Sequence, residues 1–162
     1  MGADVAILII WAIQAAAVLI LATRAAYLRR WPAAAGLLLG VLIGFSPHVL
    51  ARGQVGPEAG ATIFGASIIL VVLSTLVLGV AYGVGRRWIP LLLLLAILGV
   101  PSAYMVAGIR SFPPSSNPAF LGPLEALGEL NFFLAPIACA LAFREILSGI
   151  GGLIANWKER AA

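Results

Sequence analysis

The sequence predicts an all-α integral membrane protein, folded as a single bundle of five transmembrane helices. Of its 162 residues, 62% are hydrophobic and 10% are charged, whereas about a quarter of the residues in a soluble domain are charged. The mean hydropathy is +1.10. Five apolar stretches are each long enough to cross a hydrocarbon core of roughly 30 Å. No hydrophilic stretch is long enough for a soluble domain, so residues 1–162 are predicted to form one transmembrane domain.

The first two helices are expected at residues 4–27 and 33–51. The N-terminal apolar run has no basic residue before it, which favours a retained transmembrane helix over a cleaved signal peptide. An Arg-Arg-Trp-Pro segment that begins at Arg29 follows the first run. Arginine and tryptophan are typical of a helix end at the membrane interface, and proline suits the first turn of the next helix. The two helices are therefore predicted to form a hairpin.

The third and fourth helices are expected at residues 61–83 and 90–109, and a similar Arg-Arg-Trp-Ile-Pro segment that begins at Arg86 joins them. This similarity indicates two like-oriented hairpins. Either one hairpin was duplicated, or both acquired arginine and tryptophan independently because they end at the same interface. The fifth helix is expected at residues 124–150, with a bend at Pro136.

The distribution of positive charge predicts the orientation of the bundle. Five crossings place the two termini on opposite sides of the membrane, and basic residues are enriched on the cytoplasmic side. The prediction is a multi-pass protein of the cytoplasmic membrane, with its N-terminus outside and its C-terminus in the cytoplasm. The residues expected inside are Arg24, Arg29, Arg30, Arg86, Arg87, Arg144, Lys158 and Arg160, whereas Arg52 and Arg110 are expected outside.

Small residues indicate two helix-packing faces. Gly36, Gly40 and Gly44 are spaced four apart and share one helix face, which leaves room for the backbone of another helix. Ser67 and Ser74 are spaced seven apart on the third predicted helix and form a second small-residue face. We expect these five residues to lie in helix contacts.

Three ionisable residues are candidates for a role within the membrane, where charge is costly. Glu125 and Glu129 share one face near the start of the fifth predicted helix, and Arg110 ends the fourth on the same side. Burial and mutual repulsion would raise the pKa of one carboxyl and suit it to carrying protons. The structural alternative is an ion pair between Glu129 and Arg110. The sequence leaves both interpretations open.

His48 is the sole histidine and a weak candidate for cofactor binding, through a hydrogen bond to a quinone head group. A structural role at a helix end is the ordinary alternative. Cys139 is the sole cysteine and is expected to be a small buried residue. We predict no metal site, no catalytic residue and no cofactor held by this chain alone, and leave contact with lipid or quinone open.

The sequence favours a structural function over a catalytic one. It contains none of the common phosphate-binding, nucleophile or zinc-protease motifs, and its basic residues separate helices rather than form a nucleic-acid-binding patch. The leading hypothesis is a non-catalytic accessory or assembly subunit of a larger membrane complex, with a bioenergetic complex as the expected partner. The alternatives are a small transporter or channel that acts as a homo-oligomer and a membrane enzyme that acts on lipid or quinone. The expected contacts are other integral membrane subunits and membrane lipid, with no nucleic acid.

Overall fold

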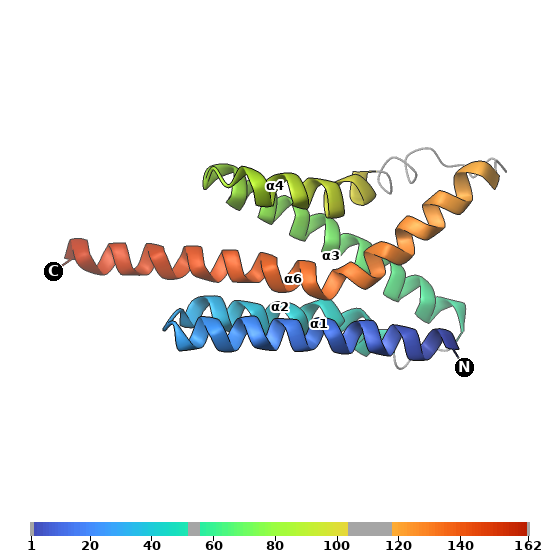
Figure 1. Cartoon of the computed structure of the whole chain (residues 1–162), viewed down its shortest axis with the longest axis horizontal. Helices are drawn as coiled ribbons and strands as arrows, with labels where there is room; N and C mark the ends of the chain where they lie inside the picture. The colour runs from blue at the N-terminus through green and yellow to red at the C-terminus, as the bar shows by residue number, and fades with distance from the viewer. Residues whose placement is uncertain (1, 52–55, 104–117, 162) are drawn as a thin grey trace.

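In the residues that the structure describes, the protein is an all-α bundle of five helices, which confirms the predicted fold class (Figure 1). The structure is a computed structural model that describes residues 2–51, 56–103 and 118–161. Four of the helices are long and apolar enough to cross a membrane, and Trp88–Ala103 is shorter. The elements in chain order are α1 (Gly2–Tyr27), α2 (Trp31–Leu50), α3 (Pro57–Val84), α4 (Trp88–Leu94) with the π-helical segment η2 (Leu95–Gly99), and α6 (Pro118–Ala161).

Proline residues shape several helices in the expected way. Pro32 and Pro57 lie in the first turns of α2 and α3, where a missing N–H costs no intrahelical hydrogen bond. Pro101 lies in the helical stretch that starts with α4 and continues past η2. It has no N–H and so cannot donate a hydrogen bond to the preceding turn. Just before it, the N–H of Val100 donates to the carbonyl of Leu95, five residues back. The π-helical segment therefore absorbs the disturbance that proline causes.

The two helical hairpins have the same turn. Arg29 and Arg86 adopt left-handed φ values of 56° and 51°, a conformation that often ends a helix. The N–H of Arg30 then donates to the carbonyl of Ala25 at 2.8 Å, and the N–H of Arg87 donates to that of Tyr82 at 2.9 Å. The similarity between the two Arg-Arg-Trp segments thus extends to the backbone hydrogen bonds of both turns.

The centre of the bundle is α6, which runs between the α1–α2 hairpin and the α3–α4 hairpin (Figure 1). Two hydrophobic cores lie on opposite sides of it. Val18, Ala22 and Leu37 meet Ala140 on the α1–α2 side. On the other side the core contains Val71 and Leu78 of α3, Leu94 and Leu98 of the α4 helix, and Ala135, Ala138 and Ala142 of α6.

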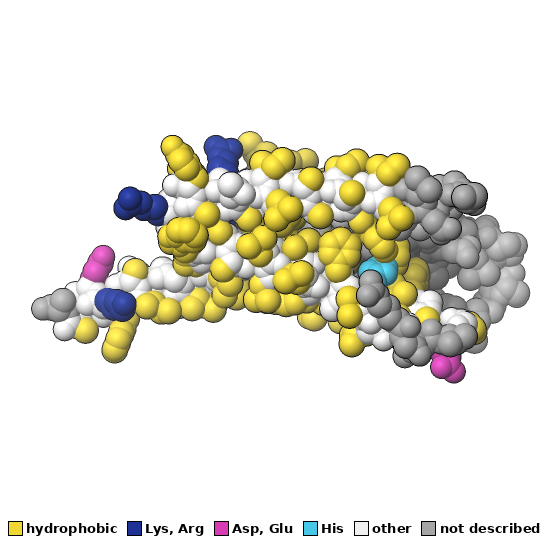
Figure 2. Space-filling model, turned by 90° about the horizontal axis from the view of Figure 1, so that it is seen from below, with side chains coloured by type: hydrophobic (Ala, Val, Ile, Leu, Met, Phe, Trp, Pro, Cys, Tyr) yellow, Lys and Arg dark blue, Asp and Glu magenta, His cyan; other side chains and the backbone are white. Residues whose placement is uncertain are grey.

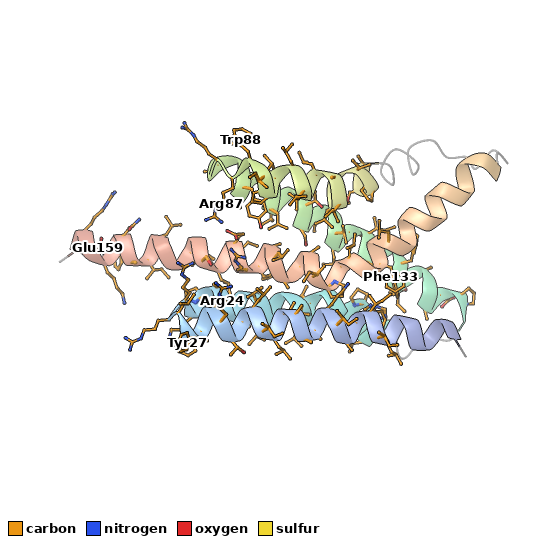
Figure 3. The ribbon with its side chains drawn as sticks, in the orientation of Figure 1. Arg24, Tyr27, Arg87, Trp88, Phe133 and Glu159 are labelled. Atoms are coloured by element: carbon orange, nitrogen blue, oxygen red, sulfur yellow. The ribbon has the colours of Figure 1, made fainter. Side chains whose placement is uncertain are left out.

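At both ends, α6 extends beyond the predicted range of 124–150, because it begins at Pro118 and ends at Ala161. The prediction followed the limits of the apolar sequence, whereas a helix continues wherever its backbone hydrogen bonds do. Beside Phe133, three residues before Pro136, the helix bends, and its N-terminal part turns away from α1 and α2 (Figures 1 and 3). Proline causes such bends because it removes one hydrogen bond and its ring clashes with the preceding turn.

The described chain ends lie at opposite ends of the bundle, and both hairpin turns lie at the same end as the C-terminal part of α6 (Figure 1). We call this the basic end, because it carries Arg29, Arg30, Arg86, Arg87, Lys158 and Arg160. On the face that Figure 2 shows, Lys and Arg side chains lie at this end, and hydrophobic side chains are spread over the middle of the bundle. The surface of the protein therefore suits a membrane interior, although the orientation of the termini stays a prediction.

Candidate functional site

The three glycines of α2 lie directly against the backbone of α6. A Cβ atom at Gly36 would lie 2.5 Å from the carbonyl oxygen of Phe143, and one at Gly40 would overlap the carbonyl oxygen of Cys139. At Gly44 the overlap would be with the Cα of Pro136. Such distances leave no room for any side chain. The contact thus continues over successive turns of both helices, with a spacing of about four residues on each.

A run of small residues in α6 makes this close approach possible on both sides of the helix. Ala135, Ala138 and Ala140 are completely buried, and Cys139 is 1% exposed. The sequence reasoning missed this run. Its signal was the segment Ala-Pro-Ile-Ala-Cys-Ala-Leu-Ala, in which small residues occur on every face rather than on one stripe.

Ser67 and Ser74 of α3 are both buried, together with Val71 and Leu78 of the same helix. The Oγ of Ser74 donates a hydrogen bond to the Sγ of Cys139 at 3.5 Å. The Oγ of Ser67 has no hydrogen-bond partner among the described residues. Cys139 therefore behaves as a small packing residue that links α6 to α3.

His48 lies in a group of rings that we call the aromatic cluster: Trp11, Phe45, His48, Phe132 and Phe133. The ring centroids of His48 and Trp11 are 4.3 Å apart, and those of His48 and Phe132 are 4.9 Å apart, both in edge-on geometry. The rings of Trp11 and Phe45 also pack edge to face. The cluster joins α1, α2 and α6 at the end of the bundle opposite the basic end.

A hydrogen bond beside the bend in α6 ties α1 to this cluster. The Nε2 of Gln14 donates to the carbonyl oxygen of Phe133 at 2.8 Å, and Figure 3 shows Phe133 where α6 bends. Pro136 has no N–H to donate to the carbonyl of Phe132, four residues earlier, so the helix is weakened at this turn. Side chains of neighbouring helices often support a helix at such a point in membrane proteins, and Gln14 adds a hydrogen bond from α1 to the next carbonyl along, that of Phe133.

A group of charged side chains gathers at the basic end. The Nη2 of Arg144 lies 3.1 Å from the Oε1 of Glu145, and the Nη1 of Arg87 lies 4.0 Å from the same oxygen. Arg24 and Arg30 make no ion pair within the described ranges. Figure 3 shows Arg24 at the end of α1 and Arg87 before α4, on either side of α6.

Two adjoining cavities open among these arginines. The first has a volume of about 270 Å³ and is lined by residues that include Arg30, Arg87, Arg144 and Glu145. The second has a volume of about 250 Å³ and is lined by residues that include Arg24, Arg30 and Arg144. Because Arg30 and Arg144 line both cavities, the two form one continuous basic region.

The remaining predicted site residues are Arg110, Glu125 and Glu129, and the structure does not describe their side chains. Arg110 lies outside the described residues. Glu125 and Glu129 belong to the N-terminal part of α6, where only the backbone is described. The proton-carrying role and the ion pair with Arg110 therefore both stay predictions. In the described part of the chain, no group of three or more His, Cys, Asp or Glu residues could hold a metal ion.

Four glycines of α3 have open space beside them, and three of these, Gly65, Gly79 and Gly83, share one helix face, whereas Gly60 lies on another. A Cβ at Gly65, Gly79 or Gly83 would meet no atom within 4 Å among the described residues.

Comparison of the chain with protein-family models, with curated proteins and with solved structures finds no match. The site must therefore be interpreted from its own geometry.

Proposed function

We propose that this protein is a non-catalytic accessory subunit that packs against other integral membrane subunits of a larger complex. The observation that carries the proposal is the open glycine face of α3, formed by Gly65, Gly79 and Gly83. The glycines of α2 have their partner helix, α6, inside the bundle, whereas those of α3 leave backbone accessible from outside.

The three glycines of α3 share one helix face, since their separations of fourteen and four residues are close to whole numbers of helical turns. Leu76 and Val80, which lie beside them, are 62% and 67% exposed. Both also line an apolar groove of about 390 Å³ between α3 and α6. A glycine face beside an apolar groove suits a transmembrane helix, because close backbone approach drives helix association where the hydrophobic effect does not.

The proposed partner is a transmembrane helix of another subunit. A bioenergetic complex is the partner class that we propose, because such assemblies commonly contain small polytopic subunits. The argument for a partner helix comes from the α3 face, whereas the argument for this class of complex is general.

The test is extraction of the native membrane in mild detergent, followed by sizing and mass spectrometry of the proteins that migrate with this chain. We expect co-migration in a fixed ratio with other membrane subunits. A Gly79→Leu/Gly83→Leu variant should reduce co-migration about tenfold, since overpacking a helix contact costs roughly 1–3 kcal/mol. Gly149→Leu is the matched control, because a Cβ at that position also meets open space and lies on α6.

Migration of the chain alone or as a homo-oligomer would contradict the proposal. Solute flux in proteoliposomes of the purified chain would then support the alternative of a small homo-oligomeric transporter, because an accessory subunit by itself carries no flux.

A further inference from the structure

We propose that the basic end of the bundle holds the headgroup of an anionic phospholipid, in the two adjoining cavities lined by Arg24, Arg30, Arg87 and Arg144. This inference is independent of the proposed partner helix, because it concerns another part of the molecule. It starts from an imbalance of charge: four arginines surround the cavities, and among the residues that the structure describes Glu145 is the only acidic one that lines either cavity.

The imbalance is greatest at Arg24 and Arg30. Glu145 is 16% exposed on its side chain and is already engaged by Arg144 and Arg87. Arg24 and Arg30 form no ion pair within the part of the chain that the structure describes, yet both line the second cavity together with Arg144. Three guanidinium groups around one cavity repel one another unless an anion joins them. Arginine also suits phosphate in particular, because its planar fork donates two parallel hydrogen bonds.

The backbone adds to this positive potential. Ala33, in the first turn of α2, lines both cavities. No side chain caps the N-terminus of α2. Pro32 has no N–H and the N–H of Ala34 donates to the carbonyl of Arg30, so the N–H groups of Trp31 and Ala33 remain as donors, and the helix dipole presents partial positive charge. The helix start thus points to the same ligand chemistry as the arginines, a phosphate group.

The other walls of the second cavity indicate that the phosphate belongs to a lipid. Leu21, Leu28 and Leu37 line it together with the arginines. Leu37 is buried, whereas Leu21 and Leu28 are 39% and 52% exposed. Apolar contacts therefore continue from the arginines onto the outer surface of α1, where acyl chains would lie. Basic pockets between transmembrane helices are known to bind lipid headgroups of this kind.

The experiment measures thermal unfolding and lipid retention of the full chain in nanodiscs of stated composition. We expect phosphatidylglycerol or diphosphatidylglycerol to raise the melting temperature above that in phosphatidylcholine, and native mass spectrometry to find the anionic lipid bound. An Arg24→Gln/Arg30→Gln variant should bind it about tenfold or more weakly, since each arginine near the surface contributes about 1 kcal/mol. Neither residue pairs with Glu145, so this variant keeps the ion pairs of the basic end.

An Arg86→Gln/Arg160→Gln variant is the matched control. It loses the same charge at the same end of the molecule, but neither residue lines a cavity. Equal losses in both variants would overturn the proposal, because they would show general attraction to an anionic surface. Equal stabilisation by phosphatidylcholine would also overturn it. Stabilisation by inorganic phosphate alone, at the concentration of lipid used, would assign the cavities to a free anion instead.

Discussion

At the scale of single residues, His48 illustrates how packing can account for a residue that the sequence marks as a candidate ligand. Its ring lies between those of Trp11 and Phe132, with centroids 4.3 Å and 4.9 Å away. Edge-on aromatic pairs contribute about 0.5–1.5 kcal/mol each beyond the area that they bury. The imidazole therefore occupies a defined place in the aromatic cluster, where its planar ring packs against the neighbouring rings.

This gives a prediction that separates shape from chemistry. We expect the free energy of unfolding of the His48→Phe variant to lie within about 1 kcal/mol of that of the unchanged protein. For the His48→Ala variant this free energy should fall by roughly 2–4 kcal/mol, because the substitution leaves a cavity. Unfolding in a detergent titration would measure both. Trp157→Ala is the control, since Trp157 is 71% exposed and packs against little of the bundle. If the phenylalanine variant were as unstable as the alanine variant and also lost bound quinone, the imidazole itself would be required.

At the scale of the elements, α2 and α6 pack closely because the glycines of α2 place no side chain between the two backbones. The glycines of α2 bring its backbone onto the small residues of α6, and the two helices stay in register from Gly36 to Gly44. Dispersion and close backbone contact stabilise such pairs in lipid. Space at a glycine, rather than its flexibility, is what this contact requires.

Adding one methyl group should accordingly have opposite effects at two glycines. Gly40→Ala places a carbon onto the carbonyl of Cys139 and the Cα of Ala140, so we expect it to lower the free energy of unfolding by about 1–3 kcal/mol. Gly79→Ala meets open space and should raise it by up to about 1 kcal/mol, because alanine favours helix. Thermal unfolding in one detergent would compare the two variants. A stable Gly40→Ala variant would show that α2 and α6 can separate at little cost.

The helices themselves were largely predictable, but their arrangement was not. Apolar length and the prolines at helix starts carry the fold class, because each is a local property of the chain. The central place of α6 depends on which faces are buried, and the small residues from Ala135 to Ala142 indicate this only once both neighbours are known. The basic region is harder still: Arg24, Arg30, Arg87 and Arg144 are far apart in sequence, and each by itself indicates topology alone.

At the scale of the whole molecule, one end carries both hairpin turns and the exit of α6, and thus most of the positive charge (Figures 1 and 2). The opposite end carries the start of α1, the start of α3 and the aromatic cluster. Such asymmetry sets orientation during membrane insertion. The two ends are therefore expected to meet different compartments, with the basic end facing the cytoplasm.

Cysteine labelling can test this orientation in whole cells. We expect Glu58→Cys, at the start of α3, to react with an impermeant maleimide from outside, and Glu159→Cys to react only after permeabilisation. Both positions are exposed. The native Cys139 is 1% exposed and should not interfere, and the unsubstituted chain controls for this. The reverse labelling pattern would place the basic end outside and contradict the predicted topology.

The position of α6 between the two hairpins also has a consequence for biogenesis. The helix that separates the two cores is the last of the five in chain order, so the ribosome completes both hairpins before the residues that join them emerge. At about 5–20 residues per second, the inner glycines of α2 wait several seconds for α6. During that interval these glycines lack their partner helix and are open to contact with other helices. Assembly of the two hairpins into one bundle is therefore expected to wait for α6, and truncation within α6 should leave two hairpins that quality-control proteases remove.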